Sequence, residues 1–176
     1  MAQLTRSTEE LVRRAGELAV EYEAEFKGCT QTTFLAIADT LRWGGLEIIS
    51  PDAVDELFPG ISLLSAGIAI TGEGSCGAVT GATLAIGLAL AKARGVQGRD
   101  MTTMGDSCAI VRREVLDKFY DTYNSQRCMD IQLKRFGKAW DFRIPEMSDE
   151  FLAITDGCAI KDTAQSVVAA IANELR

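Results

Sequence analysis

Residues 72–95 read GEGSCGAVTGATLAIGLALAKARG, and this stretch decides the predicted fold. From Gly74 to Ala91 it carries no charged residue and is rich in Gly, Ala and Thr. Gly77 and Gly81 form a small-xxx-small pair, a pattern that lets neighbouring helices approach closely. We therefore predict a buried central helix from about Ser75 to Gly95.

The same uncharged stretch lies at the lower length limit for a membrane span. It lacks flanking aromatic anchors and follows Glu73 closely, so we expect no membrane span. The N-terminus, Thr5-Arg6-Ser7-Thr8-Glu9-Glu10, has no apolar signal core, which favours a cytoplasmic location.

Helix signals continue on both sides of the central stretch. Ser7 and Glu10 form a capping box, which predicts a first helix to about Phe26. A second helix is expected from about Cys29 to Arg42, stopped by Gly44-Gly45, and a short third helix from Pro51 to about Phe58, broken by Pro59-Gly60. After the central helix, we expect a helix capped by Asp106-Ser107 and ending near Asn124, and another from Ser125 to Gly137. Asp156-Gly157 is expected to open the last helix. The segment Ile61–Ile70 fits a buried helix or a strand, and Lys138–Met147 is expected to be a loop.

These signals predict an all-α fold, a compact bundle of about seven to nine helices around the small-residue helix. No repeat, linker or low-complexity stretch divides the chain, so residues 1–176 are expected to form a single helical domain.

Composition excludes several function classes. The chain of 176 residues has a formal net charge of −7, which argues against a nucleic-acid partner. It contains no histidine, so it has no Cys–His dyad, no Ser–His–Asp triad and no His-ligated zinc. Its chemically soft, redox-capable groups are five cysteines.

The cysteines share a predicted position. They are Cys29, Cys76, Cys108, Cys128 and Cys158, and each falls in the first turn of a predicted helix. Free N–H groups and the positive end of the helix dipole stabilise anions there. We therefore expect lowered thiol pKa values, and converging helix starts would form a thiolate pocket. Cysteine is also a common core residue, so packing alone remains an alternative.

Residues Gly72-Glu73-Gly74-Ser75-Cys76-Gly77 formally match the dinucleotide-binding pattern GxGxxG. No second strand with an acidic end follows at the required distance, so nucleotide binding is not favoured. The backbone at Gly74, Ser75 and Gly77 is instead expected to turn tightly and to surround Cys76 in the site.

With these residues in place, the chain resembles the C-GCAxxG-C-C family of proteins described as redox-active. Cys76-Gly77-Ala78-Val79-Thr80-Gly81 reads CGAxxG, with Gly28-Cys29 upstream and Cys128 and Cys158 downstream. A related domain occurs in split-Soret cytochromes. The resemblance implies Cys29, Cys76, Cys128 and Cys158 as the functional set and leaves Cys108 outside the pattern.

Three functions follow from this resemblance and from the residues. The four thiolates match the ligand count of a [2Fe–2S] or [4Fe–4S] cluster, which indicates an electron-transfer protein with a redox partner protein. Alternatively, the same cysteines act as cluster-free thiol–disulfide groups, with Cys108 as a possible resolving thiol. A third reading is a helical interaction domain with structural cysteines. The sequence leaves open whether the chain is an enzyme and whether it forms a homo-oligomer.

Overall fold

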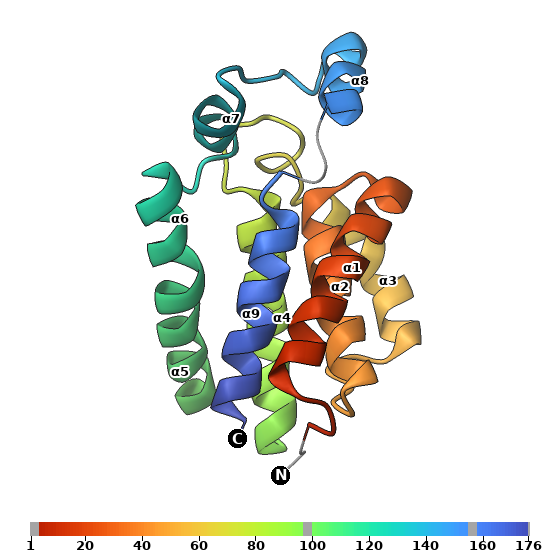
Figure 1. The fold of residues 1–176 in the computed structure, drawn as a ribbon, viewed down its shortest axis with the longest axis vertical. Coiled ribbons are helices and arrows are strands. Elements are labelled where there is room, and N and C mark those ends of the chain that lie inside the picture. The colour runs from red at the N-terminus through yellow and green to blue at the C-terminus, as the bar shows by residue number, and fades with distance from the viewer. Residues whose placement is uncertain (1–3, 97–99, 155–157, 176) are drawn as a thin grey trace.

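The structure is a computed structural model that describes residues 4–96, 100–154 and 158–175. Its centre is formed by four neighbouring helices, α1 (Thr8–Phe26), α2 (Cys29–Trp43), α4 (Gly77–Arg94) and α9 (Ile160–Glu174) (Figure 1). Helix α2 contacts the other three, and α9 contacts both α1 and α4. No β-strand occurs in the described residues, so the predicted all-α bundle is confirmed.

The remaining helices surround this centre. Helix α5 (Met101–Val111), the π-helical segment η1 (Arg112–Leu116) and α6 (Asp117–Tyr123) follow one another along one flank, where α5 and η1 pack against α4 (Figure 1). Helix α3 (Pro51–Ser62) packs against α2 on the other flank. Helices α7 (Cys128–Phe136) and α8 (Pro145–Ile154) lie at the upper end of the bundle in this view.

Helix α4 is the buried, small-residue helix that the sequence predicts. Ala78, Ala82, Ala85 and Ala89 are each 0% exposed. A Cβ atom added at Gly81 would collide with the carbonyl oxygen of Thr30, so glycine lets α4 lie directly against α2. Within the described chain, no helix combines the length and apolar character that crossing a membrane requires.

Several predicted helix ends are confirmed by their caps. The Ser7–Glu10 capping box opens α1, with both reciprocal hydrogen bonds present. Helix α4 starts after Cys76 and ends at Gly95, which has a φ of 66°. Asn124 and Gly137 end α6 and α7 in the same left-handed conformation.

The prediction that Pro59-Gly60 breaks the third helix is wrong. Helix α3 continues through Pro59 to Ser62. Pro59 is exposed on this surface helix, so water can satisfy the carbonyl group that loses its N–H partner. Ile61 and Ser62 form the end of α3, and the rest of the expected segment, 63–70, is neither a strand nor a buried helix. The chain turns, and Ala66, Gly67, Ile68, Ala69 and Ile70 have consecutive positive φ values between 50° and 75°.

The expected loop Lys138–Met147 contains the start of α8, because Pro145 occupies the first helical position. Trp140 in this segment is 2% exposed and packs edge-on against Phe151 of α8, with ring centroids 5.3 Å apart. The expected cap of the last helix, Asp156-Gly157, lies outside the described residues, and α9 itself begins at Ile160.

Candidate functional site

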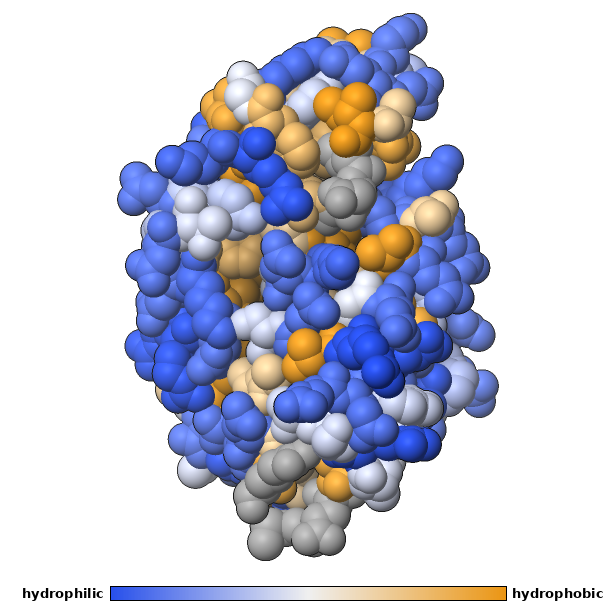
Figure 2. All heavy atoms as spheres, in the orientation of Figure 1, coloured by the Kyte–Doolittle hydropathy of each residue, from blue (hydrophilic) through white to orange (hydrophobic). Residues whose placement is uncertain are grey.

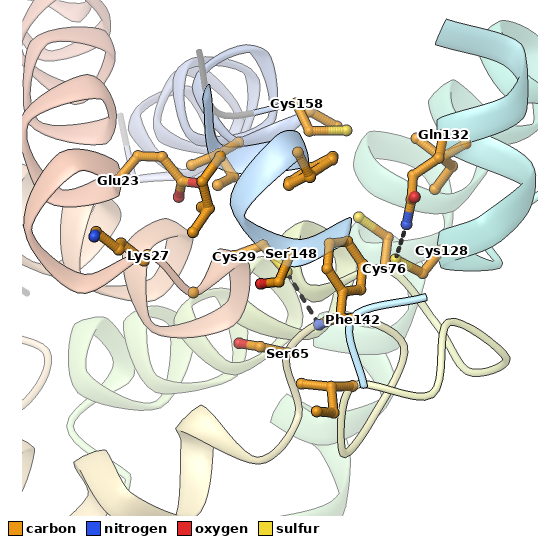
Figure 3. Close-up of a pocket in the computed structure, with 18 residues that line it drawn as sticks. Glu23, Lys27, Cys29, Ser65, Cys76, Cys128, Gln132, Phe142, Ser148 and Cys158 are labelled. Carbon is orange, nitrogen blue, oxygen red and sulfur yellow. Dashed lines mark hydrogen bonds between the residues drawn. The ribbon is translucent and has the colours of Figure 1, made fainter. Parts of the chain in front are cut away.

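A cavity of about 250 Å³ lies between the end of the bundle and helices α7 and α8. Cys29, Cys76, Cys128 and Cys158 all line it (Figure 3). Cys76 and Cys128 are buried, Cys29 and Cys158 are partly exposed, and all four are free thiols. The fold therefore brings together four sulfur atoms from segments that are far apart in the sequence.

Each of these cysteines lies at the start of a helix. Cys29 and Cys128 are the first residues of α2 and α7, and Cys76 is the N-cap of α4. Cys158 lies two residues before Ile160, the first residue of α9. The unpaired N–H groups of these four helix starts are therefore close to the sulfur atoms.

Cys108 does not share this position. Asp100 caps α5 by accepting a hydrogen bond from the Thr103 N–H group at 2.8 Å, so the actual cap lies six residues before the expected cap at Asp106-Ser107. Cys108 consequently lies inside α5, is exposed, and does not line the cysteine cavity. The prediction of a helix start at Cys108 is wrong.

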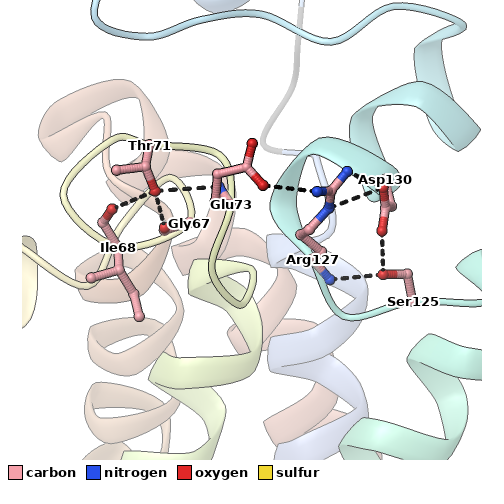
Figure 4. Close-up of polar contacts among 7 residues, drawn as sticks. All are labelled: Gly67, Ile68, Thr71, Glu73, Ser125, Arg127 and Asp130. Carbon is pink, nitrogen blue, oxygen red and sulfur yellow. Dashed lines mark hydrogen bonds and ion pairs between the residues drawn. The ribbon is translucent and has the colours of Figure 1, made fainter.

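Backbone pairing sets Cys76 beside Cys128. The Cys76 N–H group donates to the Gln126 carbonyl at 2.7 Å, and the Cys128 N–H group donates to the Gly74 carbonyl at 3.0 Å. Ser75 and Arg127 form an antiparallel bridge between the two segments. On the surface above, the Arg127 guanidinium pairs with Glu73 at 2.8 Å and with Asp130 at 2.9 Å (Figure 4).

Glycine is required at two of the predicted backbone positions around Cys76. A Cβ atom at Gly74 would lie 2.7 Å from the Gly67 carbonyl oxygen of the left-handed turn. A Cβ atom at Gly77 would collide with the Cys29 sulfur. These glycines therefore let Cys29 and the turn approach the start of α4, where a larger side chain would separate the cysteines.

Hydrogen-bond donors point at the sulfur atoms. The Ala66 N–H group donates to Cys29 Sγ at 3.4 Å, and the left-handed turn presents this group to the cavity. Gln132 Nε2 donates to Cys128 Sγ at 3.2 Å. The Gln132 side chain is fixed because its Oε1 accepts from the Trp140 N–H group at 2.8 Å. Sequence reasoning missed Gln132, which is 1% exposed on the inward face of α7.

Burial dominates the electrostatics of the four thiols. It raises the pKa of Cys128 to about 12 and that of Cys158 to about 11, and it also raises the pKa values of Cys29 and Cys76. Backbone N–H groups lower the pKa values of Cys29, Cys76 and Cys158, but by less than burial raises them. The expected lowering of the thiol pKa values is therefore wrong, because removal from water outweighs the helix N-termini.

Glu23 is a further lining residue that the sequence did not single out. Burial raises the pKa of its carboxyl group to about 7, and a hydrogen bond with Thr32 acts in the opposite direction. Glu23 lies between two other glutamates of α1, Glu21 and Glu25, which are exposed, so its residue type does not indicate that it is buried. The helical spacing of Glu23 does indicate an inward position, because Glu23 is four residues after the buried Ala19 and three before the partly buried Phe26.

The residues that could hold a cofactor are the four cysteines of the cavity. In the described part of the chain, no group of three or more Cys, Asp or Glu residues is arranged to hold a single metal ion. The donor set nevertheless fits an iron–sulfur cluster chemically, since such clusters are bound by four thiolates and tuned by hydrogen bonds to sulfur. Four cysteines and two hydrogen-bond donors to sulfur are present around this cavity.

Comparison with known proteins gives one family match. A family model described as "Putative redox-active protein (C_GCAxxG_C_C)" matches residues 27–169, which include the four cysteines of the cavity. Neither a curated protein nor a solved structure matches the chain.

Proposed function

The chain belongs to the C-GCAxxG-C-C family of proteins described as redox-active, and on this premise we propose that its cavity cysteines hold an iron–sulfur cluster for electron transfer. Cys29, Cys76, Cys128 and Cys158 are the proposed ligands. One observation carries the proposal, namely that four cysteines from separate helix starts line one cavity. A cluster bound there would accept an electron and return it.

The raised thiol pKa values favour this function over cluster-free thiol exchange. Thiol exchange requires a thiolate, and burial holds all four thiols in the neutral form near pH 7. Four buried thiolates without a cation would repel one another and lose their hydration. Iron supplies the positive charge that makes thiolates stable in such a place, because a coordinating thiol is deprotonated outright.

The surrounding residues would hold the thiolates and tune the reduction potential. The Ala66 N–H group and the Gln132 amide donate hydrogen bonds to Cys29 and Cys128. Donors at sulfur stabilise the more negative, reduced state, so they raise the reduction potential. Phe142, Phe151 and Leu152 line the cavity on the α8 side and limit access of water.

We also propose that a redox partner protein binds at the end of the molecule that carries the cavity. Ile144 and Ile154 are 43% and 57% exposed beside and within α8. Figure 2 shows apolar side chains on the surface at this upper end, whereas hydrophilic residues dominate most of the face below. We place this exchange in the cytoplasm, where free thiols persist.

The proposal is tested by purifying the chain without oxygen and measuring iron, acid-labile sulfide and visible absorption. About two or four iron atoms per chain with matching sulfide are expected. Cys29→Ser, Cys76→Ser, Cys128→Ser and Cys158→Ser should each lower the iron content. The matched control is Cys108→Ser, which should leave it unchanged, because Cys108 lies outside the cavity.

An iron-free, colourless preparation that forms a reversible disulfide between cavity cysteines would instead support thiol–disulfide chemistry. Iron content that falls equally in Cys108→Ser and in the cavity variants would show that the wrong ligands have been assigned.

A further inference from the structure

Glu23 lies between two hollows of the molecule. On its inner side it lines the cysteine cavity. On its outer side it lines a surface groove together with Val20, Ala24, Asp149 and Ala153, all of which are exposed. Lys27 and Leu152 also border both hollows. A proton on the Glu23 carboxyl group can therefore come from bulk water through the groove and be held beside the sulfur atoms.

The one hydrogen bond that favours the charged form of the Glu23 carboxyl group is with Thr32, and burial outweighs it. The Glu23 Oε2 atom is buried without a hydrogen bond, and Glu23 forms no ion pair within the described residues. Lys27, the C-cap residue of α1, is exposed, and Figure 3 shows its amine pointing away from the Glu23 carboxylate. The group is thus free to change its protonation state as the charge around it changes.

Charge on Glu23 and charge in the cavity act against each other. The groups that face it are Lys27 of its own helix, Asp149 of α8 across the groove, and Cys29 and Cys158 across the cavity. The Glu23 charge raises the pKa values of both these cysteines, and it forms no hydrogen bond with either. By reciprocity, an added negative charge in the cavity makes Glu23 bind a proton more tightly.

We propose that Glu23 is the proton-transfer residue of the cysteine cavity, taking up a proton through the groove when the cavity gains an electron and releasing it when the electron leaves. The proposal rests on the proposed redox function. In the reduction step, one electron from a one-electron donor protein enters the oxidised site, and one proton from water forms an O–H bond on the Glu23 carboxylate. No other bond forms or breaks, and oxidation reverses both transfers.

This coupling makes the reduction potential depend on pH. Burial raises the pKa of Glu23, to about 7 in the chain without a cluster, and the negative charge gained on reduction makes the pKa of the reduced site higher than that of the oxidised site. At pH values between the Glu23 pKa of the oxidised site and that of the reduced site, the uptake of each electron is accompanied by the uptake of about one proton. The midpoint potential should therefore fall by about 59 mV per pH unit in that range for a one-electron couple, since each pH unit is a tenfold change.

The test is a redox titration of the wild-type chain, Glu23→Gln and Glu25→Gln from pH 5 to pH 9. Glu23→Gln should lose the pH-dependent slope above pH 7 and should have a higher potential than wild type at pH 9. The matched control, Glu25→Gln, changes the same charge two residues away on the exposed face of α1 and should keep the wild-type slope. Equal slopes in wild type and Glu23→Gln would overturn the proposal.

A second measurement does not depend on any variant folding. Redox difference infrared spectra of the wild-type chain with carbon-13-labelled glutamate should show a protonated carboxyl band that appears on reduction at pH 8. Its absence would overturn the proposal.

Iron and sulfide analysis separates this proposal from the proposed function. If the chain carries a reversible disulfide in place of a cluster, the couple transfers two electrons. Its two protons then go to the two thiols, which burial keeps neutral, so the cavity gains no charge and Glu23 takes up no proton; this outcome would overturn both proposals, whereas a loaded cluster with equal slopes would overturn the Glu23 proposal alone. A chain with no reversible couple would overturn both proposals.

Discussion

At the scale of single residues, burial decides the chemistry of this cavity more than local sequence does. The sequence predicts the helix-start positions of the four cavity cysteines, and from these positions we expected stabilised thiolates. The structure adds the removal of four thiols from water, which reverses the direction of their pKa shifts. Sequence position indicates which donors are near a sulfur atom, but not how much water surrounds it.

Glu23 gives a pH-dependent stability prediction. Its pKa is about 7 in the folded chain, against an ordinary value of 4.5. Between these values the folded state holds the proton more tightly than the unfolded state, so the free energy of unfolding falls as pH rises from about 4.5 to 7. Above pH 7 the full penalty applies, at most about 3–4 kcal/mol.

Glu23→Gln should remove this penalty. Urea unfolding of the reduced, iron-free chain should show the variant gaining stability relative to wild type between pH 5 and pH 8, on the order of 1–3 kcal/mol. Glu25→Gln, on the exposed face of the same helix, should stay within about 0.5 kcal/mol of wild type at both pH values. A stability difference for Glu23→Gln that does not change with pH would contradict the assignment.

At the scale of elements, local signals located most helices, and the errors have physical causes. The Asp106-Ser107 pair resembles a cap, but Asp100 makes the actual capping bond to Thr103, and sequence alone ranks the two equally. The left-handed turn at 66–70 could not be predicted, because left-handed conformation costs roughly 1–2 kcal/mol per non-glycine residue. Its backbone hydrogen bonds, such as Gly72 N–H to the Ala66 carbonyl at 2.9 Å, exist only in the folded chain.

The packing of α4 on α2 gives a prediction at this scale. Gly81→Ala places a methyl group against the Thr30 carbonyl, a backbone atom that cannot move alone, so the two helices must separate. We expect a loss of about 1–3 kcal/mol in the free energy of unfolding. Gly87→Ala on the same helix meets no atom within 4 Å and should gain about 0.5–1 kcal/mol through helix propensity.

Chemical denaturation of both variants measures this contrast. Because the two substitutions are chemically identical and lie on one helix, their difference isolates the contact with α2. A stabilising effect at both positions would show that α4 does not lie as close to α2 as the structure places it.

At the scale of the whole molecule, the site depends on long-range assembly. The sequence supplied the four cysteines through the CGAxxG pattern and its partners, but their convergence depends on features no short window contains. These include the pairing of residues 72–76 with 126–129 and the contact of Cys29 with Gly77. Gln132 became recognisable only once the fold had placed it on the cavity wall, and the helical spacing of Glu23 indicates an inward position but not the cavity that it lines.

The same assembly predicts which part of the molecule depends on the cluster. Helices α1, α2, α4 and α9 contact one another around a shared apolar core that includes Leu11, Ile37, Ile86 and Val168. Helix α8 has no buried residue, and α7 buries Cys128, Ile131 and Gln132 against the cavity. Residues 126–154 form the cavity roof; one proposed ligand, Cys128, lies within this segment, and another, Cys158, follows it.

Removing iron from the loaded chain should therefore loosen this roof before the bundle. Hydrogen–deuterium exchange should show protection in residues 126–154 falling by about tenfold or more, while α2, α4 and α9 keep theirs, because their opening depends on the apolar core. Cys108→Ser, treated in the same way, should reproduce the wild-type pattern. A uniform loss of protection would show that the bundle cannot hold its structure without the cluster, and an unchanged roof would show that Cys128 and Cys158 do not bind it.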